Sequence, residues 1–140
     1  MSSNTELTAA QKRRIQKAVK SVPYARLLGF ELDEVSPGAA TLGLKIRKDL
    51  MQNHGVVHGG AIASLIDTAT AFAIIPLLTP KEKVTTVDLT ISYLQPITKG
   101  RVSATARVVR AGRRLIVVSA EVRSEDGKLA ATALSTYIKF

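Results

Sequence analysis

The longest apolar segment of the chain, residues 59–75, constrains the fold more than any other feature. Its sequence is GGAIASLIDTATAFAII, and between Met51 and Thr79 the only formally charged side chain is that of Asp67. The segment has no two-residue alternation and stops before Pro76, so its length favours a helix that is buried on most sides. A helix this apolar needs a curved sheet around it, which indicates an α+β fold.

A membrane span is the alternative for this segment, because its length is sufficient to cross a bilayer. However, His58, Asp67 and Pro76 interrupt the apolar run, and no second span is found. Ionisable residues are rare within membrane-spanning helices. The first 16 residues also lack the apolar core of a signal peptide. We therefore expect no membrane partner and a cytoplasmic location.

Strand patterns flank the central segment on both sides. Apolar and polar residues alternate over residues 39–47, and again over residues 86–96. In the second of these stretches, strict alternation predicts Val87 and Tyr93 on one face and Thr86 on the other. Further strands are expected at residues 101–109, 114–122 and 129–140, with a hairpin at the EDGK sequence. We expect the four strands after the central helix to form a meander.

The N-terminal residues predict a short helical arm. Thr8 followed by Gln11 is typical of a capping box, and Leu7 lies just before it. Apolar residues then recur at helical spacing, with lysines and arginines off that stripe, where they are best explained as solvated surface. The sequence thus indicates an arm over residues 1–24, followed by a single domain over residues 25–140.

Composition narrows the range of chemistry. The chain of 140 residues has no cysteine, which excludes disulfides, thiolate metal sites and a cysteine nucleophile. His54 and His58 have the spacing of a zinc-protease helix, but the required glutamate is missing, so we expect no metal. The formal net charge is +9. A basic chain attracts nucleic acid, anionic membranes or phosphorylated small molecules.

Asp67 is the first candidate for chemistry. Its helical neighbours are alanine, serine, threonine, leucine and isoleucine, and no lysine or arginine is within local reach. A carboxylate in such surroundings is costly to desolvate unless it is hydrogen-bonded or paired. An ordinary exposed or capping aspartate is the structural alternative. The apolar context favours a carboxylate retained for function, as a general base or a nucleophile.

Gly59 and Gly60 are the second candidate. A helix N-terminus offers unpaired N–H groups, and glycine lets a ligand approach the backbone closely, as in an oxyanion hole. A turn needed only for helix entry is an equally good explanation. Gly59 and Asp67 are eight positions apart, about 12 Å along one helix. If both act on one carbonyl, the working unit is at least a dimer with two equivalent sites.

Two stretches now permit a comparison with a known family. The chain resembles the hotdog-fold acyl-CoA thioesterases of the phenylacetic-acid-degradation subgroup in the stretch NHGVVHGGAIASLIDTATAFA and in the strands that follow it. The shared features are an aspartate eight residues after the first glycine of the HGG motif and a strand that ends in YLQP. The resemblance extends from about Ala25 to the C-terminus. It implies a hotdog fold, in which a curved antiparallel sheet wraps a long central helix. It also implies two-fold dimers, often assembled into homotetramers, and hydrolysis of an acyl-CoA thioester.

The resemblance also implies roles for individual residues. Asp67 would be the catalytic carboxylate, the N–H of Gly59 would polarise the thioester carbonyl, and His58 and Gly60 would shape that turn. Thr86 matches a position where a hydroxyl often helps place the attacking water. The family usually has asparagine seven residues before the first glycine of the pair. This chain has Gln52 at that position and Asn53 one place later, and either amide could face the site.

Coenzyme A, as part of the substrate, is the partner that the resemblance implies, and no separate cofactor is expected. Its phosphates would suit the arginines around the AGRR turn, with Lys99 nearby. Solvated charge on a hairpin is an equally good explanation for each of these residues. The candidate coenzyme A contacts are Gly60, Lys99, Arg110, Gly112, Arg113 and Arg114.

A thioesterase acting on an aryl- or medium-chain acyl-CoA has three alternatives. Hotdog hydratases use motifs that are absent here. A non-catalytic acyl-CoA sensor, or a nucleic-acid-binding protein, would suit the positive charge. About 25 residues precede the expected core, too few for a helix-turn-helix domain, and the basic strip lacks interleaved aromatics. We therefore expect no nucleic-acid partner.

Overall fold

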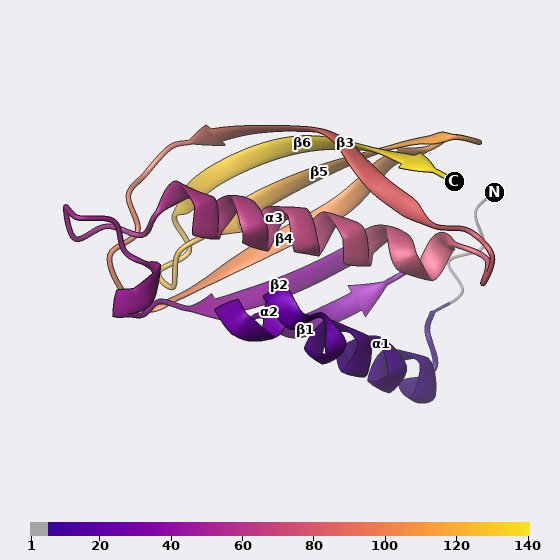
Figure 1. The fold of residues 1–140 in the computed structure, drawn as a ribbon, viewed down its shortest axis with the longest axis horizontal. Coiled ribbons are helices and arrows are strands. Elements are labelled where there is room, and N and C mark those ends of the chain that lie inside the picture. Colours follow the sequence, from indigo (N-terminus) through magenta and orange to yellow (C-terminus); the bar gives the residue numbers. More distant parts are fainter. Residues whose placement is uncertain (1–5) are drawn as a thin grey trace.

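The computed structural model describes residues 6–140, which form a six-stranded antiparallel sheet and a long central helix (Figure 1). This is the α+β hotdog fold that the sequence predicts. The elements are α1 (Ala9–Ser21), α2 (Pro23–Leu28), β1 (Glu31–Ser36), β2 (Ala39–Lys45), the 3₁₀ turn η1 (Lys48–Leu50), α3 (Gly59–Ile74), the 3₁₀ turn η2 (Ile75–Leu77), β3 (Val84–Tyr93), β4 (Arg101–Ala111), β5 (Leu115–Arg123) and β6 (Leu129–Lys139).

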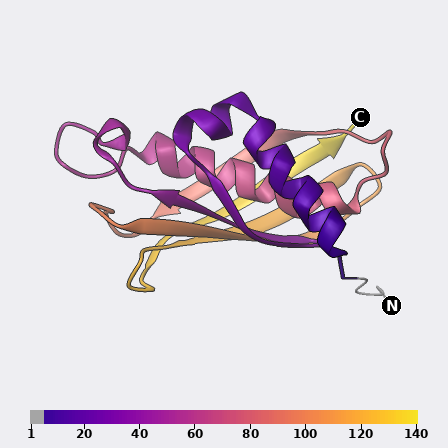
Figure 2. The same ribbon diagram turned by 90° about the horizontal axis from the view of Figure 1, so that it is seen from below.

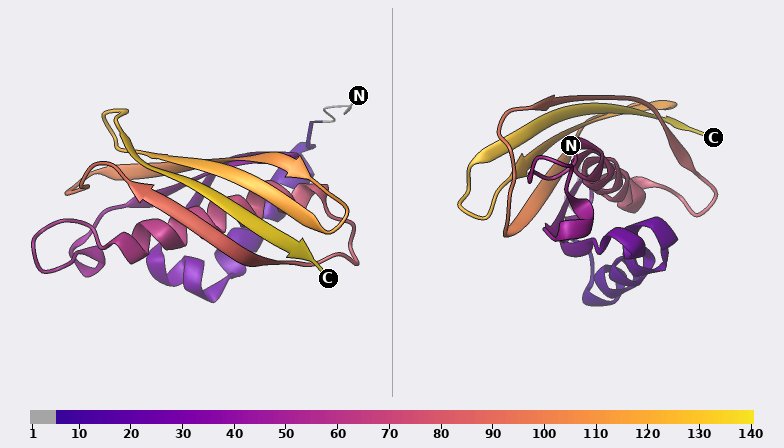
Figure 3. Two further views of the ribbon diagram at one scale, coloured as in Figure 1. Left: turned by 90° about the horizontal axis from the view of Figure 1, so that it is seen from above. Right: turned by 60° about the vertical axis from the view of Figure 1, so that its left-hand side comes forward.

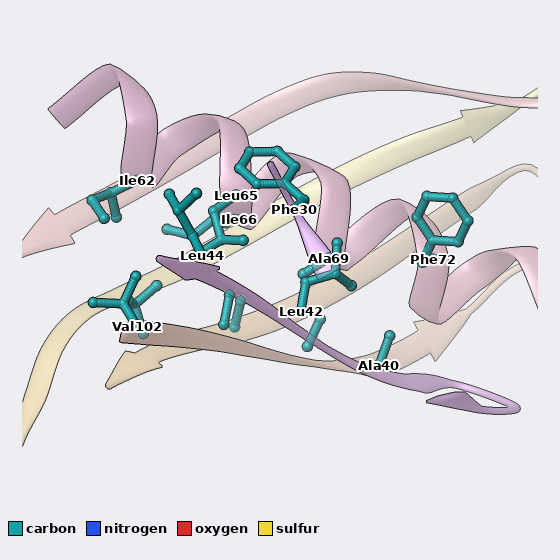
Figure 4. Packing of buried hydrophobic residues seen from close by; sticks show 14 of the residues in the cluster. Phe30, Ala40, Leu42, Leu44, Ile62, Leu65, Ile66, Ala69, Phe72 and Val102 are labelled. Atoms are coloured by element: carbon teal, nitrogen blue, oxygen red, sulfur yellow. The ribbon is translucent and has the colours of Figure 1, made fainter. Parts of the chain in front are cut away.

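The central helix α3 forms the core with the concave face of the sheet. Leu65, Ile66 and Ala69 are fully buried, and they face sheet residues such as Leu42 and Leu44 (Figure 4). The sheet arches over α3, as seen along the helix in Figure 3. Helix and 3₁₀ turn together, Gly59–Leu77, have the length and hydropathy of a membrane span. Here the segment is the core helix of the domain, which explains why it is apolar nearly all round.

The strand order is β1-β2-β4-β5-β6-β3. The expected four-strand meander is therefore only partly right, because β4, β5 and β6 are sequential neighbours whereas β3 pairs with β6 at the edge. Side-chain alternation indicates which face of a strand is buried, but it does not indicate which strand is the neighbour. Within residues 6–140, β3 therefore has one unpaired edge, and it runs beside α3.

The N-terminal arm begins as predicted. Thr8 caps α1 in a full capping box, in which its side chain accepts from Gln11 N–H and the Gln11 side chain accepts from Thr8 N–H. A second short helix, α2, was not predicted. It starts at Pro23 and ends at Gly29, whose φ of 85° suits glycine. α1 packs against β1, and α2 packs against α1 (Figure 2). Residues 1–5 of the predicted arm lie outside the described residues.

Candidate active site

His58 shapes the N-terminus of α3. It is the N-cap residue, and its Nδ1 accepts a hydrogen bond of 2.8 Å from Gly60 N–H. This geometry requires the ring to be unprotonated at Nδ1. A Cβ at position 60 would lie 2.9 Å from the same nitrogen, so a glycine is needed for the cap. The N–H of Gly60 already donates to His58. The predicted contact of Gly60 with coenzyme A would therefore have to use another atom of this residue.

Gly59 is the first residue of α3, and its N–H has no acceptor among residues 6–140. Its carbonyl accepts a hydrogen bond of 2.8 Å from the hydroxyl of Tyr93 at the end of β3. A Cβ at position 59 would lie 3.3 Å from the Tyr93 ring. Burial raises the pKa of Tyr93, which keeps this phenol protonated as the donor. Tyr93 of β3 thus holds the first residue of α3 in place, and the N–H of Gly59 keeps no acceptor among residues 6–140.

Asp67 lies two turns further along α3, where two hydroxyl groups meet its carboxylate. Thr86 of β3 donates to Oδ1 at 2.8 Å, and the Tyr137 hydroxyl of β6 lies 3.3 Å from the same oxygen. No salt bridge reaches Asp67 within residues 6–140. The half-buried carboxylate therefore has two hydroxyl groups, and no basic side chain of residues 6–140, within hydrogen-bond distance.

A β-bulge brings Thr86 to Asp67. The pairing of β3 with β6 shifts register between Thr86 and Asp88, and Val87 is left 54% exposed. Strict alternation predicted Thr86 on the face opposite Tyr93, and that assignment is wrong. The extra residue turns Thr86 onto the helix-facing side, the side from which Tyr93 contacts Gly59. A pattern of period two cannot reveal such a bulge.

Tyr137 was missed by the sequence reasoning. It is 2% exposed, and burial raises its pKa to about 12. Its hydroxyl lies 2.8 Å from Asp67 O and 2.7 Å from Thr70 Oγ1. The available signal was two polar side chains, Ser135 and Tyr137, at alternate positions of the last strand, which place them on its buried face.

Gly59 and Asp67 open into different cavities. Asp67 borders one of about 680 Å³, formed by α3, η2, the start of β3 and the α1–α2 corner. Gly59 borders one of about 290 Å³, beside the end of β3. The larger cavity is mainly apolar, with walls from Val22, Ala71, Phe72, Ile75, Leu78, Pro80 and Val84. The two candidate groups therefore do not share a site within one chain.

The two candidate amides lie in the turn before α3. Gln52 is half-buried, and its side-chain oxygen accepts from His54 N–H, while its backbone N–H bonds to Val56 O at 2.9 Å. Asn53 is exposed. Neither residue borders the Asp67 or the Gly59 cavity. Gln52 organises the turn, and the choice between the two amides stays a prediction.

The basic residues fall into two groups. Arg110, Gly112, Arg113 and Arg114 form the β4–β5 hairpin, and Arg114 O accepts from Lys139 N–H at the end of β6. Lys99 lies before β4, at the other end of that strand, roughly 30 Å away at 3.3 Å per residue. The expectation that Lys99 lies near the arginines is therefore wrong within one chain.

The chain is similar in sequence and structure to known thioesterases. Residues 54–131 match the model of the thioesterase superfamily. The chain belongs to the thioesterase superfamily. The fold confirms the hotdog prediction, and the chain is a thioester hydrolase that is similar to the phenylacetic acid degradation protein PaaI.

Individual relatives cover nearly the whole thioesterase chain. It is 30% identical to the medium/long-chain acyl-CoA thioesterase YigI of Escherichia coli K12, over 94% of this chain and 96% of the relative. It is 31% identical to a solved mutant of the phenylacetic acid degradation protein PaaI from Thermus thermophilus, with a TM-score of 0.78 over 84% of this chain and 99% of that one. A thioesterase structure from Haemophilus influenzae has a TM-score of 0.85 at 23% identity, covering 98% of this chain and 93% of that one, and shows the shared fold.

Proposed function

We propose that this thioesterase hydrolyses an acyl-CoA, with Asp67 as the reacting carboxylate and the N–H of Gly59 from a second subunit as the oxyanion donor. One observation carries the proposal. Asp67 is held at Oδ1 by Thr86 and Tyr137 and borders a mainly apolar cavity of about 680 Å³. An oriented, ionisable carboxylate beside space for an apolar group is what acyl-ester hydrolysis requires.

The oxyanion half of the site is the start of α3. The free N–H of Gly59 stands at the positive end of the helix dipole, which favours an oxygen that gains negative charge. Gly59 and Asp67 are separated by about 12 Å along α3 and border different cavities. A single chain therefore holds two half-sites, which favours assembly of the complete site from two chains.

The unpaired edge of β3 is the surface we propose for this assembly. A ten-residue strand with an open edge tends to pair with another strand. On this strand, Thr86 is hydrogen-bonded to Asp67, and Tyr93 is hydrogen-bonded to Gly59. Antiparallel pairing of two β3 strands around a two-fold axis at Leu89 or Thr90 would bring Thr86 of one chain opposite the Tyr93 end of the other, within about one residue. Each Asp67 would then approach the partner's Gly59.

In the proposed reaction, Gly59 N–H binds the thioester carbonyl oxygen and Asp67 acts on the carbonyl carbon. As a general base, Asp67 takes a proton from water while the water oxygen attacks the carbon. The tetrahedral intermediate then collapses, the C–S bond breaks, and coenzyme A leaves as a thiolate that takes up a proton. As a nucleophile, Asp67 would instead form an acyl anhydride with loss of coenzyme A, and water would hydrolyse the anhydride. Thr86 holds Oδ1 in either case.

The acyl group is proposed to occupy the cavity beside Asp67, which suits an aryl or medium-length acyl chain. Two relatives support this range, since one is named a medium/long-chain acyl-CoA thioesterase and the other a phenylacetic acid degradation protein. Coenzyme A enters as part of the substrate. In an antiparallel dimer, Lys99 of one chain would lie at the same end as the partner's β4–β5 hairpin, so both basic groups remain candidates for its phosphates.

Assembly beyond the dimer is proposed to use the outer face of the sheet. Val109, Leu115 and Leu134 are each at least half exposed, and Leu115 and Leu134 alternate with buried residues that face α3. Two dimers packed through these side chains would form a homotetramer. A cytoplasmic location also remains a proposal.

The test is replacement of Asp67 by asparagine or alanine. Thiol release from phenylacetyl-CoA and from medium-chain acyl-CoA esters should fall by at least about a hundredfold, while the oligomer mass from light scattering stays unchanged. Asp126→Asn is the matched control, because Asp126 is an exposed carboxylate in the turn between β5 and β6, outside the proposed dimer strand. Full hydrolysis by Asp67→Asn would refute the proposed mechanism.

A further inference from the structure

The buried phenol of Tyr137 contacts Asp67 twice. Its hydroxyl lies 2.8 Å from the backbone carbonyl of Asp67 and 3.3 Å from the carboxylate oxygen Oδ1. The third neighbour is Thr70 Oγ1, at 2.7 Å. Tyr137 of β6 thus brings one hydroxyl close to both the backbone carbonyl and the carboxylate of Asp67.

The Thr70 and Tyr137 hydroxyls have one proton each, which limits the hydrogen bonds that this cluster can form. Thr70 Oγ1 lies 3.0 Å from Ile66 O and 3.0 Å from Asp67 O, so it can donate to a helix carbonyl. Tyr137 has one proton and can give it to Thr70, to Asp67 O or to Asp67 Oδ1. A hydrogen bond to a charged acceptor is stronger than one to a neutral acceptor. The charge of Asp67 therefore decides which acceptor the phenol prefers.

We propose that Tyr137 is a positioning residue for hydrolysis, whose hydroxyl donates to Oδ1 of ionised Asp67 and turns to Asp67 O when the carboxylate loses its charge. With Thr86 on the same oxygen, this leaves Oδ2 without a partner among residues 6–140 and available for the reaction. No proton leaves the phenol, which only rotates. Burial keeps the pKa of Tyr137 at about 12, so the donor persists at neutral pH. The inference rests on the proposed role of Asp67.

The surroundings of Asp67 contain few other charges. α3 carries no second charged side chain. Glu82 and Lys83, from the segment before β3, border the same cavity, and Glu82 pairs with Lys139 at 3.1 Å. The α1–α2 corner contributes Val22 to the cavity wall. Among residues 6–140, the hydroxyls of Thr86 and Tyr137 contact the carboxylate, so Tyr137→Phe removes one of these two donors.

The experiment measures kcat and KM of Tyr137→Phe from pH 4 to pH 9 with a medium-chain acyl-CoA. Loss of a donor to the charged form disfavours that form. We expect kcat to fall about tenfold, KM to change little, and the acid-side midpoint of kcat/KM to rise by about one pH unit. A purely structural role would lower thermal stability or the amount of active enzyme without moving that midpoint.

Two control variants separate positioning from packing. Tyr24→Phe makes the same chemical change at a hydroxyl that contacts Ser64 at 2.9 Å, and should leave the profile unchanged. Thr70→Val removes the other partner of the phenol but preserves its contact with Asp67, and should leave the midpoint in place. A profile of Tyr137→Phe that superimposes on that of the unmodified enzyme overturns the inference.

A second measurement covers the case in which Tyr137→Phe does not fold. Site-specific 3-fluorotyrosine at position 137 preserves the shape of the ring and makes the phenol a stronger donor, so the acid-side midpoint should fall. An unchanged midpoint in that protein overturns the inference. If Asp67→Asn hydrolyses thioesters normally, the proposed function itself fails. If Asp67→Asn is inactive and the Tyr137 variants keep the normal midpoint, only the role of Tyr137 fails.

Discussion

Complementation between two inactive variants tests whether each active site uses two chains. The first variant, Asp67→Asn, removes the carboxylate. The second, Gly59→Pro, removes the N–H that is proposed as the oxyanion donor. Proline is tolerated at the first position of a helix, and His58 before it has φ −62° and ψ 132°, the extended conformation that a residue before proline adopts. The helix should therefore form without that single donor.

Each variant alone should be nearly inactive. Loss of one oxyanion donor costs about 10²–10³ in kcat. Gly59→Ala is the matched control, because it adds the same crowding 3.3 Å from the Tyr93 ring but retains the N–H. Activity well above that of Gly59→Pro is expected for this control. Equal losses in the two variants would assign the effect to Tyr93 rather than to the missing N–H.

Mixing the two variants should restore activity. When chains associate at random, about half of the dimers contain one chain of each kind. In each such dimer, one site combines the intact Gly59 of the first chain with the intact Asp67 of the second, and the other site contains both lesions. About half of the sites in about half of the dimers are then complete, which gives about a quarter of normal activity.

The assay co-expresses the two chains with different affinity tags, purifies the mixed oligomer through both tags, and measures thiol release. Each mixed dimer should reach about half of normal activity, because one of its two sites is complete. If Gly59 and Asp67 act within the same chain, every site in a mixed dimer carries one lesion. Mixed dimers as inactive as the parents would therefore refute the two-chain site.

Two further predictions concern the acyl cavity and the buried phenol. Ala71→Phe fills the cavity beside Asp67, so kcat/KM for medium-chain and aryl esters should fall at least about tenfold, while acetyl-CoA hydrolysis in the same thiol-release assay serves as the internal control. Tyr137 has a folded-state pKa of about 12 against an ordinary value of 10.0. Its protonated form therefore contributes stability that is present below about pH 10 and is lost as pH rises through about 12. Urea unfolding should show up to about 3 kcal/mol of this loss in the unmodified protein but not in Tyr137→Phe.

Much of the site could be predicted because its parts are local in sequence. Asp67 stands out as the one charge in an apolar helix, and Gly59 follows the residue that caps that helix. Their distance along α3 follows from helix geometry alone, so the sequence already predicts that a site using both residues takes them from two chains. Thr86 was named only through the family resemblance, and the alternation of its strand placed it on the wrong face.

The core helix, the capped arm and the buried faces of most strands follow from the amino-acid sequence, because each depends on contacts within a few residues. Three features emerge only in the folded chain: β3 lies at the sheet edge, a bulge at Val87 turns Thr86 toward Asp67, and Tyr137 reaches the same carboxylate from β6. These features depend on which distant strands pair and in which register. Side-chain periodicity does not encode that choice, since it is fixed by packing around α3.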